Sequence, residues 1–175
     1  MPSTSKNRPI ALVTGASSGI GEALAGLFAA AGHDLVLVAR SADKLKALAT
    51  ALSARHGVKV RVEPADLSKP GAAETLAARL RRARVPVDVL VNNAGVLAQG
   101  RFAAMGAASH QQMIDLNISG LTAMLSAFVP PMVARGTGVG AKARTQKRFS
   151  MAASTLAASA MRAFNWDMQE TPGRF

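Results

Sequence analysis

A glycine-rich segment, Thr14–Gly21, constrains the fold of this chain more than any other feature of its sequence. It directly follows the apolar run Ile10–Val13, an order that predicts a buried strand, a tight turn and the start of a helix. Gly15 permits the bend, while Gly19 and Gly21 let the backbone come close to a bound phosphate. Because free N–H groups at a helix N-terminus favour negative charge, we expect this segment to hold a dinucleotide pyrophosphate. The alternative is a turn whose glycines serve packing alone.

Short apolar runs alternate with longer helical patterns through the first 135 residues. The predicted strands are Ile10–Thr14, Leu35–Ala39, Val58–Glu63 and Val87–Val91. The predicted helices lie at about 18–31, 42–56, 70–84 and 108–134. Near-continuous apolar strands between helices are typical of a parallel sheet covered on both faces, so we expect an α/β fold with right-handed crossovers. Pro130-Pro131 should bend or end the last helix unless neighbours restore the lost hydrogen bonds.

The end of the second predicted strand carries Ala39-Arg40 at the position where NAD-binding domains of this kind hold the ribose with a carboxylate. An acid there would repel a 2′-phosphate, whereas the Arg40 guanidinium can pair with it through a fork of N–H groups. The position therefore favours NADP(H) over NAD(H), with Lys44 as a helper. The alternative is a solvated arginine at a strand end.

Four features together resemble the classical branch of the short-chain dehydrogenase/reductase family: Thr14–Gly21, Asp66, Asn92-Asn93-Ala94-Gly95 and Asn117. The resemblance covers about residues 1–138. It implies a Rossmann-like, doubly wound parallel sheet, and hydride transfer between a nicotinamide cofactor and an alcohol or carbonyl substrate. Because the pattern stops near residue 138, we expect a C-terminally incomplete sheet of about four strands whose fourth strand is an exposed edge.

The resemblance also implies roles for single residues. Asp66 would accept a hydrogen bond from the adenine amino group, Leu67 would donate its backbone N–H there, and Asn117 would support a water-linked proton relay. Without the resemblance, Asp66 is a turn or cap residue before Ser68, and Asn117 is a satisfied core polar residue. The segment Asn92–Gly95 would then be a turn. The predicted cofactor-binding residues are Thr14, Gly15, Ser17, Ser18, Gly19, Ile20, Gly21, Arg40, Asp66, Leu67, Asn92, Ala94 and Gly95.

The other catalytic groups of that family are a serine and a Tyr-x-x-x-Lys pair, and this chain does not supply the pair. It contains no tyrosine, and its last lysine, Lys147, precedes every serine of the tail. Past Gly138 the sequence becomes basic and alanine-rich, as a reading-frame shift would produce. We therefore expect an NADP(H)-binding domain at 1–138 and a non-family tail at 139–175, in a truncated or frameshifted oxidoreductase without activity. The alternative is a non-catalytic nucleotide-binding or regulatory module.

The composition limits the kinds of partner that this chain is expected to bind. The formal net charge is +11, and residues 135–175 contribute +5 of it, from seven Lys/Arg against two Asp/Glu. Aromatic residues make up only 4% and do not lie among the arginines at 79–84, which disfavours nucleic-acid binding, although contact of the basic tail with RNA or an anionic surface stays open. The chain has no cysteine, and no metal site is expected. Since no run reaches the roughly eighteen apolar residues of a membrane span, we expect a cytoplasmic protein, with self-association through the 108–134 helix.

Overall fold

The computed structural model describes residues 8–136 of the chain. These residues form a sheet of four parallel strands: β1 (Ile10–Thr14), β2 (Asp34–Ala39), β3 (Val60–Pro64) and β4 (Val89–Val91). The strand order is β3-β2-β1-β4, and Val13 of β1 pairs with both Leu37 of β2 and Val91 of β4. The predicted parallel sheet is confirmed. Because the chain order reverses between β1 and β4, the carboxyl ends of these strands flank the place where open α/β sheets bind ligands.

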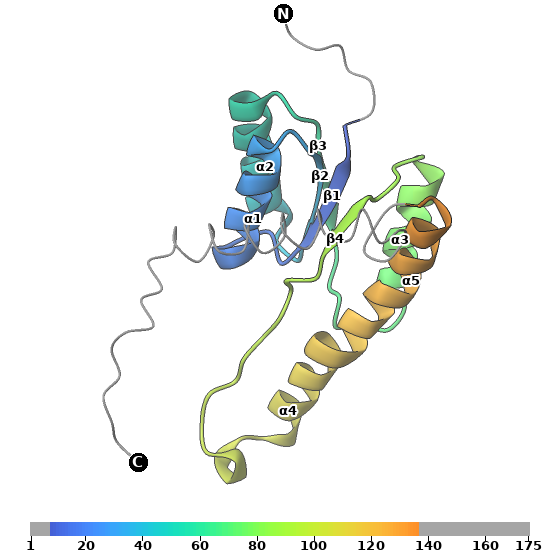
Figure 1. The fold of residues 1–175 in the computed structure, drawn as a ribbon. Coiled ribbons are helices and arrows are strands. Elements are labelled where there is room, and N and C mark those ends of the chain that lie inside the picture. Colours follow the sequence, from blue (N-terminus) through green and yellow to red (C-terminus); the bar gives the residue numbers. More distant parts are fainter. Residues whose placement is uncertain (1–7, 137–175) are drawn as a thin grey trace, which may run out of the picture.

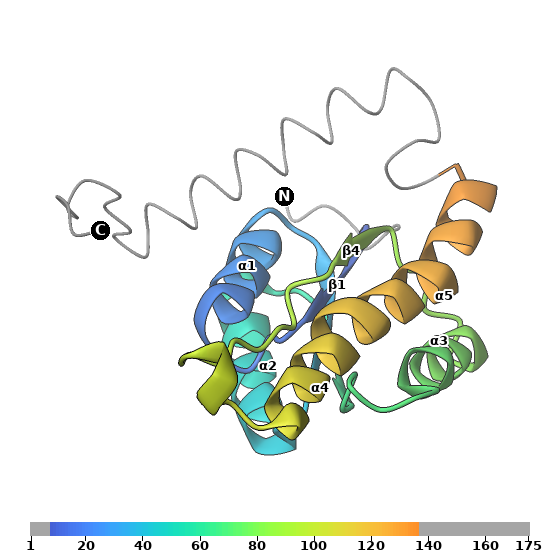
Figure 2. The same cartoon turned by 90° about the horizontal axis from the view of Figure 1, so that it is seen from below.

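The helices lie close to their predicted positions. They are α1 (Gly19–Ala30), α2 (Ala42–His56), α3 (Ala72–Arg82), α4 (Ala107–Ile114) and α5 (Leu121–Ala134). A π-helical segment, Asp115–Gly120, joins α4 to α5, so the predicted 108–134 helix is one helical stretch with a wider turn inside it. Helices α1 and α2 cover one face of the sheet, and α3 and α5 cover the other, with α4 reaching beyond the sheet (Figure 1, Figure 2).

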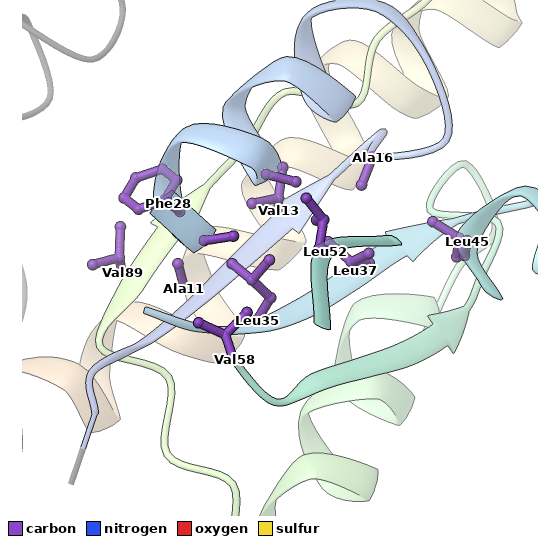
Figure 3. Packing of buried hydrophobic residues seen from close by; sticks show 12 residues of the cluster. Ala11, Val13, Ala16, Phe28, Leu35, Leu37, Leu45, Leu52, Val58 and Val89 are labelled. Carbon is purple, nitrogen blue, oxygen red and sulfur yellow. The ribbon is translucent and has the colours of Figure 1, made fainter. Parts of the chain in front are cut away.

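Side chains of the strands point alternately to the two faces and feed two hydrophobic cores. The core under α1 and α2 includes Ala11, Val13, Phe28, Leu35, Leu37, Leu45 and Leu52 (Figure 3). The core under α3 and α5 includes Leu12, Val36, Val38, Leu76, Leu80, Met124, Phe128 and Met132. Because both faces are covered, β1 and β2 are apolar along almost their whole length rather than at every second residue.

Helix α5 continues through Pro130-Pro131 to Ala134, which agrees with the predicted 108–134 helix, so the two prolines do not end it. A proline cannot donate the hydrogen bond to the carbonyl four residues earlier, which for Pro130 is that of Ser126. Both prolines and Ser126 lie on the exposed side of the helix, where water can bond a carbonyl that has lost its N–H partner. The exposed side of the helix therefore tolerates the two prolines, whereas a buried side would leave the Ser126 carbonyl without a hydrogen-bond partner.

Two surfaces on the α5 side stay open within residues 8–136. Strand β4 has no strand on its outer side there, which agrees with the predicted edge. The helical stretch Ala107–Ala134 is long and apolar enough to cross a membrane by length and composition alone, with a mean hydropathy of 1.4, a test that core helices of soluble proteins also pass. The predicted tail at 139–175 lies outside the described residues.

Candidate functional site

A cavity of about 430 Å³ lies at the carboxyl ends of the strands, beside the glycine turn. Its walls come from the four segments that follow β1, β2, β3 and β4, with one residue from the π-helical segment. The polar and glycine residues that line it are Gly15, Ser17, Ser18, Arg40, Ser41, Lys44, Asp66, Asn93 and Gly95. The cavity therefore occupies the crevice at the switch point between β1 and β4, where this topology places ligands.

The glycine turn packs tightly against the segment after β4. Gly15 has a φ of +66°, and a Cβ there would lie 2.9 Å from Asn93 Nδ2 and 3.0 Å from Ala94 Cα. A Cβ on Gly21 would collide with the backbone oxygen of Gly15. Gly19 differs, because its φ is +60° but a Cβ would meet open space. Gly15 and Gly21 thus serve close approach within the protein, whereas Gly19 serves the left-handed backbone of the turn.

The N-terminus of α1 faces this end of the sheet with unused donors. Ser18 precedes the helix in an extended conformation and makes no side-chain capping bond within the described residues. The first N–H groups of an α-helix have no acceptor within the helix, and here they belong to Gly19, Ile20 and Gly21. Ile20 is 48% exposed. Serine hydroxyls, free N–H groups and the helix dipole together suit an anion.

Thr14 fixes the position of the Asn-Asn-Ala-Gly segment. Its side chain is 1% exposed, and its Oγ1 accepts hydrogen bonds from the backbone N–H groups of Asn93 and Ala94, both at 2.9 Å. The same hydroxyl donates to the Val91 carbonyl at 3.2 Å, and Asn93 Nδ2 donates to the Thr14 carbonyl at 3.1 Å. The hydroxyl of Thr14 is thereby fully used in joining the ends of β1 and β4.

Two cations and one carboxylate line the far part of the cavity. Arg40 follows β2 directly, and Lys44 lies in the first turn of α2. Asp66 follows β3, and its Oδ1 accepts hydrogen bonds from the Ser68 hydroxyl at 2.7 Å and the Ser68 N–H at 3.1 Å. The Ser68 hydroxyl bond, with a smaller contribution from the Arg40 charge, lowers the pKa of Asp66 against the opposing effect of burial. Asp66 therefore stabilises the turn at Ser68, as expected without the family resemblance, and it also lines the cavity, as expected from that resemblance.

Asn117 lies in the π-helical segment and is exposed, so the expected core position is wrong. Its side chain nevertheless has partners, because Oδ1 accepts from the Val96 N–H at 2.9 Å and Nδ2 donates to the Val96 carbonyl at 2.8 Å. A Cβ on Gly95 would lie 3.3 Å from Asn117 Oδ1. Asn117 therefore anchors the segment after Gly95 to the π-helical segment.

The structure brings most of the predicted cofactor residues to one place. The main cavity is lined by eight of them, which are Gly15, Ser17, Ser18, Arg40, Asp66, Leu67, Ala94 and Gly95. Thr14 and Asn92 line a small hollow next to it, which shares Leu67 and Ala94 with the cavity. Gly19, Ile20 and Gly21 form the first turn of α1. The segment Asn92–Gly95 was expected to line the cofactor, and Asn93 lines the cavity with it. Sequence reasoning missed five other lining residues, which are Val38, Ser41, Ala65, Val96 and Leu116.

Comparisons with known proteins agree with this geometry. A sequence profile for the short chain dehydrogenase family matches residues 9–141. Oxidoreductase UcpA of Salmonella typhimurium is 38% identical over 128 residues, which are 73% of this chain and 48% of that protein. The chain spans about half the length of the curated relatives it matches.

Solved structures give the same result. A short-chain dehydrogenase from Sphingobium yanoikuyae in complex with NADPH is 44% identical, with a TM-score of 0.68 over 74% of this chain and 50% of that chain. L-Sorbose reductase from Gluconobacter frateurii, complexed with NADPH and L-sorbose, is 33% identical, with a TM-score of 0.70 over 74% of this chain and 49% of that chain. The match to the sequence profile covers well over half of the residues, and this chain belongs to the short chain dehydrogenase family.

Proposed function

We propose that this chain binds NADP(H) in the cavity at the carboxyl ends of β1, β2 and β4. The observation that carries the proposal is the pair of cations, Arg40 and Lys44, that line the cavity at the end of β2, whereas Asp43 of the same turn does not line it. A 2′-phosphate placed there would meet two positive charges and no acid from β2. The NADPH held by the Sphingobium yanoikuyae and Gluconobacter frateurii proteins supports this choice of cofactor.

The proposed contacts follow the order of the elements. Ser17, Ser18 and the N–H groups of Gly19 and Ile20 would bind the pyrophosphate. Asp66, whose pKa is lowered, is ionised at neutral pH and would accept from the adenine amino group next to the Leu67 N–H. At the other end of the cavity, Asn92, Ala94 and Gly95 would follow the nicotinamide side of the cofactor.

We propose further that this chain binds the cofactor without turning it over. When bound, the nicotinamide ring supplies the hydride donor or acceptor of the reaction. A carbonyl that accepts hydride also needs a proton donor, and a tyrosine cannot serve here because the sequence contains none. Asn117, the predicted remnant of the proton relay, has both side-chain polar atoms bonded to Val96. The chain would thus act as a nucleotide-binding module derived from an oxidoreductase.

Calorimetric titration with NADPH and NADH tests the cofactor assignment. Removal of a charge-assisted contact costs about 1.5–3 kcal/mol, so we expect Arg40→Ala to weaken NADPH binding about 10- to 100-fold and leave NADH binding almost unchanged. Arg55→Ala is the matched control, because Arg55 lies in the last turn of α2, far along the helix from Lys44. Equal affinity of the unchanged chain for NADPH and NADH would contradict the role of Arg40.

Steady-state oxidation of NADPH by the pure chain, with a panel of aldehydes and ketones, tests the absence of turnover. A rate that depends on the carbonyl substrate would contradict it.

The reading-frame proposal for the tail has a separate test in the coding sequence. One of the other two frames past codon 138 should encode a serine-bearing strand and then Tyr-x-x-x-Lys, and their absence from both frames would refute the frame shift.

A further inference from the structure

A second cavity, of about 310 Å³, lies between the C-terminal parts of α3 and α5, two helices that lie side by side (Figure 1, Figure 2). It also borders the segment that leads into the amino end of β4, whereas the candidate cofactor site lies at the carboxyl ends of the strands. The two cavities share no lining residue. A cavity of this volume is at the small end of ligand pockets and suits a short ligand.

The floor of this second cavity is apolar. Leu80 of α3, Val87 before β4 and Phe128 of α5 line it, and each is at most 5% exposed. Half-buried Val85 and exposed Pro131 add apolar surface closer to solvent. A hydrocarbon group that leaves water for this floor would be stabilised by the hydrophobic effect. The floor therefore favours a ligand with an apolar part.

Three exposed arginines, Arg81, Arg84 and Arg135, line the rim of the same cavity. Among the described residues no Asp or Glu lines it, and Arg81 and Arg84 form no ion pair within residues 8–136. Arg135 donates through Nη2 to the Val87 carbonyl, which holds its guanidinium at the cavity. The rim thus offers guanidinium donors that no carboxylate of the described chain neutralises.

The positive charge at the rim exceeds the negative partial charges close to it. Both α3 and α5 end at the cavity, and a helix C-terminus carries about half a negative charge, so two such ends leave the three guanidiniums in excess by about two charges. Asp88, the acid that follows Val87 in the chain, accepts from the Ile10 N–H at 2.9 Å and does not line the cavity. The rim therefore favours an anion.

Arg84 occupies a backbone position that glycine usually takes at a helix end. Its φ is +54°, whereas every other residue with a positive φ within residues 8–136 is a glycine. The N–H groups of Arg84 and Val85 donate to the carbonyls of Arg81 and Leu80, both at 3.0 Å, which is the Schellman form of a helix end. Because a side chain at this φ strains the backbone, glycine here would suit the fold better than arginine does.

We propose that this second cavity binds a small carboxylate with a short hydrocarbon chain. The hydrocarbon chain lies on the floor of Leu80, Val87 and Phe128, and the carboxylate pairs with Arg81 and Arg84 at the rim. A guanidinium presents parallel N–H donors that match the two oxygens of a carboxylate. Since this site and the candidate cofactor site lie at opposite ends of the sheet, the proposal does not depend on NADP(H) binding.

Titration of the full-length chain with octanoate, followed through the NMR shifts of its backbone amides, tests the proposed site. We expect saturable shifts at residues 77–87 and 127–135. Octanol keeps the hydrocarbon chain without the charge, and acetate keeps the charge without the chain, so each should bind at least about tenfold more weakly than octanoate. Equal binding of octanol and octanoate, or octanoate shifts that leave these two segments unaffected, would overturn the proposal.

The variant Arg84→Gly separates binding from folding. Glycine suits the left-handed position, so the variant should melt at a temperature no lower than that of the unchanged chain. Its affinity for octanoate should nevertheless fall at least about threefold, because one guanidinium is lost from the rim. Arg82→Ala is the matched control, since Arg82 is also exposed at the end of α3 but does not line the cavity, and its affinity should stay unchanged. Equal affinities of the two variants for octanoate would overturn the proposal.

Discussion

The two faces of the sheet differ in how completely their helices bury apolar surface. On the α1 and α2 face, Ala11, Val13 and Leu37 are 0% exposed, and helices of the described chain close over them. On the other face, the inner side of α5 is equally well buried at Met124. The outer side leaves Val133 of α5 and Ile118 of the preceding π-helical segment at least half exposed. The first face is closely covered within residues 8–136, whereas the second leaves large apolar side chains exposed among those residues. The candidate cofactor site depends mainly on the closely covered face.

The largest expected effect comes from filling the close approach under the glycine turn. Gly21→Ala would place a Cβ against the backbone oxygen of Gly15, which no side-chain rotation relieves. We expect a loss of at least about 2 kcal/mol in the free energy of unfolding, measured by chemical denaturation. Gly26→Ala in the same helix is the control, because a Cβ there meets nothing within 4 Å, and it should stabilise by about 0.5–1 kcal/mol. Equal stability of Gly21→Ala and Gly26→Ala would contradict the close approach of Gly21 to Gly15.

A smaller loss should follow when the link between β1 and β4 is broken. Thr14→Val keeps the shape of the side chain but removes the hydroxyl that accepts from Ala94 and joins the two strands. We expect a cost of about 1–3 kcal/mol, together with weaker NADPH binding, because the Asn-Asn-Ala-Gly segment loses its anchor. In Thr50→Val the lost bond runs to the Lys46 carbonyl on the exposed side of α2, and the cost should stay below about 0.5 kcal/mol. If both variants behave alike, the hydroxyl of Thr14 does not organise the site.

How far the sequence alone predicts this molecule depends on how local the signals are. The strand Ile10–Thr14 was predicted to the residue, because an apolar run followed by a glycine turn is a local signal. The strand Val60–Pro64 was displaced by two residues at its start, since exposed Arg61 and half-buried Val62 give it a mixed pattern. The position of Arg40 beside the cavity followed from its place at the end of β2, because carboxyl ends of parallel strands meet at one edge.

Features that depend on distant contacts were not predictable in this way. The π-helical segment at Asp115–Gly120 has no signature of its own in the sequence. It coincides with two contacts that span long stretches of chain, those of Asn117 with Val96 and of Gly120 with the Leu67 backbone. The continuation of α5 through two prolines likewise depends on which side of the helix faces water. Only the folded chain decides these points.

The smallest expected effect concerns the edge of the packed face, where His33 joins α1 to β2. Its ring lies edge-on to Phe28 at 5.2 Å, and burial lowers the pKa of its imidazole below the ordinary value of about 6.5. The unfolded chain therefore binds a proton more readily than the folded one, so stability present at neutral pH should decline as the pH falls below about 6.5 and through the lower folded pKa. Chemical denaturation should show that the free energy of unfolding falls less between pH 7 and pH 5 in His33→Gln than in the unchanged chain. An unchanged difference would mean that water reaches the His33 ring, and that the better-packed face is open at this corner.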